Sequence, residues 1–143
     1  MMRPMLEILL VEDNEGDVEL TRRALSKAEP TVSISVANDG QQALDFLHRK
    51  GIHAEARTPD IILLDINMPR MDGKQFLAAI KQEADLKAIP VVMFTSSQSP
   101  ADIRECYERQ ASCYVVKPFD GREYADTLRE VVSFWGRTGQ LPS

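Results

Sequence analysis

The sequence predicts a single α/β domain built on a doubly wound, five-stranded parallel sheet, a (βα)5 arrangement. Its 143 residues are 43% apolar and 27% charged, which suits one globular domain with an ordinary core. Alternating strands and helices are typical of a mainly parallel sheet with helices on both faces. Short β-like runs, each followed by a segment with helical apolar spacing, cover residues 6–11, 32–37, 61–64, 91–94 and 114–116.

The composition of the runs predicts their places in the sheet. Four of them are almost continuously apolar, as expected for strands that helices cover on both faces. In the run at 32–37, valine and isoleucine alternate with serine. We therefore expect the second strand to lie at an edge of the sheet.

Capping residues and the end of the last apolar stripe predict the element boundaries. N-caps supply a side-chain oxygen to the first helical amides. The last regular element is expected to end near Trp135, which gives one domain over residues 1–143, a core over about 6–135, a short tail at 136–143 and no output domain. The residues that predict helix starts are Asp39, Asp72, Ser99 and Asp120.

Charge and cysteine spacing exclude several classes of protein. The net charge of −5 argues against nucleic acid as a partner, because phosphate recognition needs clustered basic residues. The longest apolar run near the N-terminus, at 8–11, is too short for a signal peptide or a membrane span, so we expect a cytoplasmic protein without membrane association. Cys106 and Cys113 have neither redox nor zinc spacing, and we interpret them as reduced structural thiols.

Acidic residues follow two of the predicted strands. The first runs into Glu12 and Asp13, and the third into Asp65. In a doubly wound sheet these strand ends meet at the edge where ligands bind. Carboxylates held this close must take up protons or bind a cation, and a cluster of hard oxygen ligands favours Mg²⁺, for which Mn²⁺ can substitute. Glu15 and Asp17 lie nearby, but we assign them to the positive end of the first helix.

The predicted ligand set follows from how magnesium binds proteins. It usually takes one or two carboxylates and keeps several waters. We expect Asp13 and Asp65 to bind it directly, Glu12 to act through water, and the Asn67 backbone carbonyl to complete the set.

The fourth and fifth strands end in groups that suit a phosphoryl. Thr95 offers a hydroxyl and Lys117 a cation at the same predicted edge. Alone, a strand-end aspartate is usually a helix cap, and a lone lysine or threonine is usually an ordinary exposed or strand-end residue. The combination of all three types at one edge favours phosphoryl chemistry.

Four motifs follow successive predicted strands: Glu12-Asp13, the D-x-x-M-P-x-M-D-G run at 65–73, Thr95-Ser96 and Lys117-Pro118-Phe119. With these motifs, over about residues 6–135, the chain resembles the response-regulator receiver domains of two-component phosphorelays, which have a flavodoxin-like, CheY-like fold. The resemblance implies that Asp65 accepts a phosphoryl group from a histidine of a sensor kinase and that Lys117 holds a phosphoryl oxygen. Such a phosphoprotein assists its own phosphorylation and dephosphorylation and is not an enzyme in the usual sense.

The resemblance also implies a conformational switch. Thr95 would move to the phosphoryl group and Tyr114 would rotate inward, which reshapes the face made by the fourth helix, the fifth strand and the fifth helix. Through this face the protein would bind a downstream target, a histidine phosphotransfer protein or a second copy of itself. Surplus apolar residues near the end of the last helix, Phe134 and Leu141, indicate such a dimer contact.

Finer features look most like the single-domain regulators that partner bacterial phytochrome kinases. They are the Glu12-Asp13-Asn14 start, the segment 107–114 and the long connection at 50–59, which is either a partner surface or a tolerated insertion. Gln110 departs from the family, which commonly has glycine there for the left-handed turn after the fourth helix.

Three other functions fit a similar architecture. A haloacid-dehalogenase-type phosphohydrolase would need a second aspartate two residues after Asp65, where this chain has Asn67. A flavodoxin-like cofactor binder would need a loop rich in glycine, serine and threonine after the first strand, where acidic residues stand. A receiver that binds partners without being phosphorylated remains open to experiment.

Overall fold

The computed structural model describes residues 5–28 and 30–142, so the ends of the predicted domain, residues 1–4 and 143, lie outside the described part. The predicted five-stranded parallel sheet is present. Its strands follow the order β2-β1-β3-β4-β5, and every neighbouring pair is parallel. The strands are β1 (Leu6–Val11), β2 (Val32–Ala37), β3 (Ile61–Leu64), β4 (Val91–Thr95) and β5 (Cys113–Val116).

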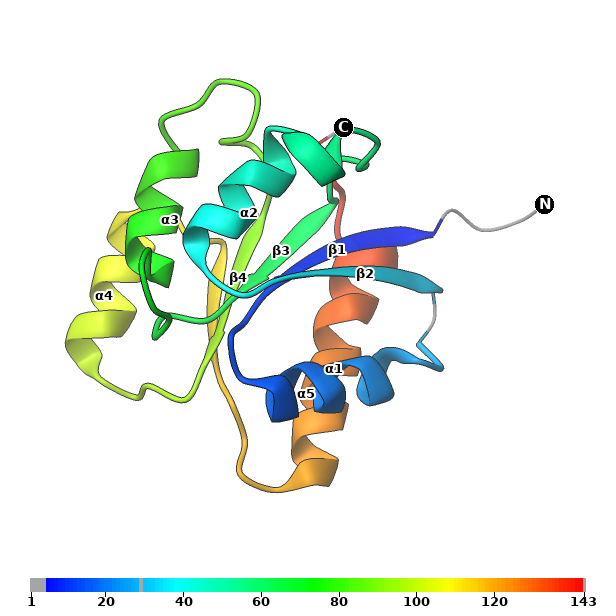
Figure 1. The fold of residues 1–143 in the computed structure, drawn as a ribbon. Helices are drawn as coiled ribbons and strands as arrows, with labels where there is room; N and C mark the ends of the chain where they lie inside the picture. Colours follow the sequence, from blue (N-terminus) through cyan, green and yellow to red (C-terminus); the bar gives the residue numbers. More distant parts are fainter. Residues whose placement is uncertain (1–4, 29, 143) are drawn as a thin grey trace.

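Helices cover both faces of the sheet, with α1 and α5 on one side and α2, α3 and α4 on the other (Figure 1). Each side holds its own buried cluster. Leu9 of β1 points into the α2–α3–α4 cluster and Ile8 into the α1–α5 cluster, as strand geometry requires. The helices are α1 (Glu15–Leu25), α2 (Gly40–Leu47), α3 (Gly73–Ile80), α4 (Pro100–Glu108) and α5 (Gly121–Ser133), with shorter turns η1 (Gly51–His53) and η2 (Phe134–Thr138).

The edge strands differ from the buried centre. β2 lies at one edge, as the serine alternation predicts, and its valines and isoleucine pack toward α1 and α5. β5 lies at the other edge. Its side chains pack on both faces as expected, but all four residues are only half-buried, because an edge strand has a neighbouring strand on one side only.

The predicted N-caps fix the starts of four helices. Asp39 accepts a hydrogen bond from the Gln42 amide at 2.8 Å, and Ser99 and Asp120 cap α4 and α5 in the same manner. Asp72 forms a full capping box, in which the Asp72 and Gln75 side chains each accept from the other's amide. These caps set where each strand-to-helix loop turns at the carboxyl edge of the sheet.

Helical backbone continues beyond the predicted end near Trp135. After α5 a wider turn runs to Thr138, where the chain leaves it through a Gly139 amide that donates to the Phe134 carbonyl. Trp135 and Leu141 pack against the α1–α5 cluster, whereas Phe134 is 49% exposed. In the described ranges no helix has both the length and the apolar character needed to cross a membrane.

Candidate functional site

The parallel ladder brings the predicted site residues to one edge. It extends one residue past three strands: the Glu12 amide donates to the Ala37 carbonyl, the Asp65 amide to the Val11 carbonyl, and the Lys117 amide to the Thr95 carbonyl, at 2.8 to 3.1 Å. Backbone bonds to the neighbouring strand therefore hold each functional residue, and the sheet itself sets their spacing.

Three carboxylates form a cluster at this edge. Glu12, Asp13 and Asp65 each place a ligand oxygen within 4.8 Å of the others. Glu12 is 2% exposed and Asp65 9%, while Asp13 is open to solvent, so the cluster has a closed base and an accessible rim. Asn67 is exposed in the loop after β3, and the role of its carbonyl stays a prediction.

Lys117 is the buried cation beside the cluster. Its ammonium donates to Glu12 Oε1 at 2.5 Å and to Asp17 Oδ2 at 2.9 Å, and it lies 3.4 Å from Asp65 Oδ2. Burial works against the charge, but the bonds to Glu12 and Asp17 outweigh it and raise the pKa of the lysine above its usual value. Lys117 is therefore charged in this structure.

One lysine does not balance these carboxylates. Burial and the charge of Asp65 raise the pKa of Glu12 to about 7, even though Lys117 acts in the opposite direction. The remaining excess of negative charge, with oxygen ligands from three side chains, is the donor chemistry that Mg²⁺ and Mn²⁺ require. The residues present fit a divalent cation.

The Thr95 hydroxyl is an orphaned polar group. Thr95 is fully buried, and its Oγ1 has no hydrogen-bond partner within the part of the chain that the structure describes. An unpaired buried hydroxyl costs about 1–3 kcal/mol. A group that arrived at this edge with free oxygens would satisfy it.

Tyr114 connects the site to the surface of α4. Its hydroxyl donates to the Ser97 carbonyl at 2.9 Å, in the loop that follows Thr95, and its amide donates to the Tyr107 hydroxyl at 3.1 Å. The ring packs against the α2–α3–α4 cluster. The residue thus touches both the loop beside the site and an exposed side chain of α4, while its switching role stays a prediction.

The loop after Asp65 is held by contacts that the sequence does not reveal. A Cβ on Gly73 would clash with the Asp65 carbonyl oxygen, so α3 starts directly against the backbone of Asp65. Arg70 has a φ of 64°, and its Nε donates to the buried Asp39 carboxylate at 2.6 Å. The sequence predicts Asp39 only as a helix cap.

Asp17 is the other residue that sequence reasoning missed. The sequence assigns it to the positive end of the first helix, whereas its carboxylate accepts a hydrogen bond from Lys117. Asp17 lies in the first turn of α1, three residues after the N-cap Asn14, and this turn begins at the carboxyl edge of the sheet, which is the signal that could have placed its carboxylate near the site.

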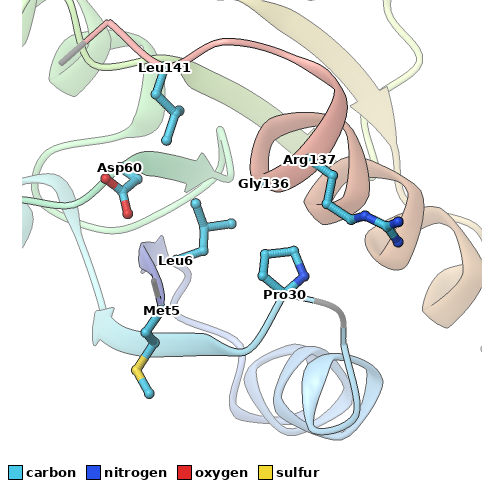
Figure 2. A pocket seen from close by; sticks show the side chains of 7 residues that line it. All are labelled: Met5, Leu6, Pro30, Asp60, Gly136, Arg137 and Leu141. Atoms are coloured by element: carbon cyan, nitrogen blue, oxygen red, sulfur yellow. The ribbon is translucent and has the colours of Figure 1, made fainter. Parts of the chain in front are cut away.

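A hollow at the other end of the sheet is larger than the hollow of about 240 Å³ beside Lys117. It measures about 410 Å³ and includes none of the predicted site residues. Figure 2 shows Leu6 and Pro30 on one side of it and Leu141 on another. Cavity size therefore does not locate the functional site in this molecule.

With the fold and site in place, comparison with known proteins decides the family. Residues 8–129 match the model of the response regulator receiver domain. The chain belongs to this family. The response regulator Rcp1 of Synechocystis sp. is similar to it, with 36% identity over 140 residues, 98% of this chain and 95% of Rcp1.

Solved receiver structures agree. The phosphorylated cyanobacterial phytochrome response regulator RcpA superposes with a TM-score of 0.93 at 36% identity, covering 98% of this chain and 100% of RcpA. The Mn²⁺-bound form of Rcp1 superposes with a TM-score of 0.90 at 36% identity, covering 96% and 99% of the two chains.

These comparisons confirm the predicted receiver family and its fold. The Mn²⁺-bound form of Rcp1 shows that a similar chain holds a divalent cation, and the carboxylate cluster here fits one. The protein belongs to a family of phosphoacceptors rather than conventional enzymes. Its phosphohydrolase and flavodoxin-like alternatives are set aside. At the turn after α4, Gln110 adopts the expected left-handed backbone, with a φ of 72°.

Proposed function

We propose that this receiver accepts a phosphoryl group on Asp65 from a phosphohistidine of a sensor kinase. One carboxylate oxygen of Asp65 forms a bond to phosphorus as the bond from phosphorus to the histidine nitrogen breaks, and the imidazole leaves. The observation that carries the proposal is that Asp65 belongs to the acidic cluster and also lies 3.4 Å from Lys117. Glu12 shares both features, but it is 2% exposed and already accepts from Lys117 at 2.5 Å, whereas Asp65 is 9% exposed and its Oδ2 has only the longer contact, which favours Asp65 as the acceptor.

The surrounding residues have separate tasks. Glu12, Asp13, Asp65 and the Asn67 carbonyl would hold the cation, which when bound offsets the negative charge of the carboxylates and of the phosphoryl oxygens. Lys117 would donate to a phosphoryl oxygen. Support for this ligand set is the 4.8 Å grouping of the carboxylate oxygens at the sheet edge.

Phosphorylation would act on the rest of the protein through Thr95 and Tyr114. The orphaned Thr95 hydroxyl gains a partner when it donates to a phosphoryl oxygen. Movement of Thr95 shifts the adjoining loop, to which Tyr114 is bonded through the Ser97 carbonyl. Because Tyr114 also bonds Tyr107 of α4, the α4–β5–α5 face changes with the site.

We also propose partners and a location. The likeness to Rcp1 and to RcpA, a phytochrome response regulator, supports a bacterial phytochrome kinase as the phosphoryl donor. On the α4–β5–α5 face and the turn beyond it, Tyr107 is 48% and Phe134 49% exposed, which suits a protein target, a histidine phosphotransfer protein or a second copy. The location we propose with these partners, for one receiver domain, is the cytoplasm.

Intact mass after incubation with acetyl phosphate and Mg²⁺ tests the proposed chemistry. We expect one phosphoryl increment in the wild type and none in Asp65→Asn or with a chelator present. Asp60→Asn, which changes a carboxylate at the opposite end of the sheet, is the control and should keep the increment. A wild type that binds Mg²⁺ but gains no mass, from acetyl phosphate or from a phosphorylated phytochrome kinase, would identify a phosphorylation-independent binding module instead.

A further inference from the structure

In the unphosphorylated protein Lys117 has several carboxylate acceptors, whereas its proposed role is to donate to one phosphoryl oxygen. An ammonium has three N–H donors, and here they face three carboxylates, those of Glu12, Asp17 and Asp65. The two short contacts are with Glu12 and Asp17, at 2.5 and 2.9 Å, and the long one, at 3.4 Å, is with the residue that becomes phosphorylated. In this state Lys117 is held mainly by residues other than Asp65.

The three acceptors differ in their relation to the cation. Glu12 and Asp65 belong to the carboxylate cluster, so a bound cation competes with Lys117 for their oxygens. Of the described carboxylates that contact Lys117, Asp17 alone stands outside that cluster. Once the cation is bound, Asp17 is the acceptor that keeps its full negative charge for the lysine.

The backbone of Asp17 is fixed, so its carboxylate cannot follow Lys117 far. Its amide donates to the side chain of Asn14, the N-cap of α1, at 2.9 Å. Its carbonyl accepts from the Thr21 hydroxyl at 2.8 Å and lies 3.4 Å from the Tyr124 hydroxyl. When Lys117 turns toward a phosphoryl group on Asp65, it must therefore lengthen or give up its bond to Asp17.

We propose that Asp17 is a positioning residue that competes with the phosphoryl group for the hydrogen bonds of Lys117. Through this competition Asp17 weakens the binding of the phosphoryl group at the site. The inference rests on the proposed function of Asp65 and adds a residue that sets how strongly the phosphorylated state is stabilised. Removing the Asp17 carboxylate leaves Lys117 free to donate fully to a phosphoryl oxygen.

Binding of beryllofluoride, a non-covalent analogue of a phosphoryl group, to the full chain at saturating Mg²⁺ tests the proposal by calorimetry. We expect Asp17→Asn to bind the analogue about three- to tenfold more tightly, the scale of a partly buried ion-pair contact. Asp17→Glu, which restores the carboxylate, should return toward the wild-type affinity. Glu15→Gln removes one charge from the same first turn of α1 and should leave the affinity unchanged.

A double-mutant cycle separates competition for Lys117 from a general effect of charge. In a Lys117→Ala background, Asp17→Asn should no longer change analogue affinity, because the shared donor is gone. Unchanged or weaker binding by Asp17→Asn in the wild-type background, or a gain that persists without Lys117, overturns the proposal. If the wild type itself binds no analogue and gains no phosphoryl mass, the proposed function has failed. If the wild type does both and Asp17→Asn leaves the analogue affinity unchanged, this inference alone has failed.

Discussion

The two ends of the sheet are built from the same strands but hold opposite kinds of structure. At the carboxyl end, Glu12 and Asp65 are buried close together and the Thr95 hydroxyl has no partner among the described residues. At the amino end, the Asp60 carboxylate accepts a hydrogen bond from the Glu7 amide at 2.8 Å, beside a largely apolar hollow. The carboxyl end therefore holds clustered carboxylates and an unpaired hydroxyl, whereas the amino end holds an apolar hollow.

This difference shows that buried polar groups without partners, rather than the volume of a hollow, mark the functional end of the sheet. Burying carboxylates together and leaving a hydroxyl unpaired both cost stability, which ligand binding can return. The apolar hollow carries no comparable cost in charge. Substitutions at the carboxyl end should therefore change cation or phosphoryl binding as well as stability, while those at the amino end should affect stability alone.

The largest expected effect is at Gly73. Gly73→Ala forces a methyl group against the Asp65 carbonyl, and we expect a loss of roughly 2–4 kcal/mol in the free energy of unfolding, together with weaker Mg²⁺ binding. Gly121→Ala is the matched control, because Gly121 also follows an aspartate N-cap but has nothing within 4 Å of its added Cβ. Denaturant unfolding and calorimetry measure both effects, and equal behaviour of the two variants would contradict the close approach.

A second prediction has the opposite sign. Thr95→Val keeps the side-chain shape and removes the orphaned hydroxyl, so it should stabilise the unphosphorylated protein by about 1 kcal/mol while weakening analogue binding. Thr21→Val is its counterpart, since the buried Thr21 hydroxyl donates to the Asp17 carbonyl, and it should destabilise by about 1 kcal/mol. Thermal and denaturant unfolding decide it; a destabilised Thr95→Val would show that the hydroxyl is satisfied in the resting protein.

At the amino end, Leu141→Ala should affect stability only. Leu141 is half-buried beside the hollow and packs on the α1–α5 cluster, so its truncation should cost about 1 kcal/mol. The rate of phosphorylation by acetyl phosphate should stay at the wild-type value. Ile52→Ala, at a side chain that is 95% exposed, should change neither quantity. A slower reaction in Leu141→Ala would link the two ends of the sheet.

The smallest expected effect is the loss of stability at low pH that comes from the Asp39 carboxyl. Burial of Asp39 opposes its ionisation, but the Gln42 amide and the Arg70 guanidinium outweigh it and lower the pKa of the carboxyl below its usual value. Because the folded pKa is depressed, the stabilisation is complete above the unfolded value, about 3.9, and is lost as the pH falls through the folded one. Unfolding curves between pH 6 and pH 3 should show this loss in the wild type and not in Asp39→Asn; parallel curves would argue against the pairing.

The sequence alone determined the strands, most helix starts and which of the candidate site residues share one edge of the sheet. Apolar runs separated by helical segments leave few arrangements other than a parallel sheet, and parallel strands must present their carboxyl ends together. The order of the strands along the chain is therefore enough to assign Glu12, Asp65, Thr95 and Lys117 to one edge. N-caps such as Asp72 act within a few residues, which makes them readable from local sequence.

Only the tertiary structure decided which of these groups are satisfied and by whom. Lys117 donates to both Glu12 and Asp17, and Arg70 donates to Asp39. The Thr95 hydroxyl has no partner among the described residues. Each of these facts depends on side chains that are far apart in the chain. The wider turn that carries the last helix to Thr138 likewise has no local signal that we recognised. Sequence patterns report periodicity and local hydrogen bonding, whereas the balance of charge at a buried site depends on distances of a few ångströms that the packed fold alone sets.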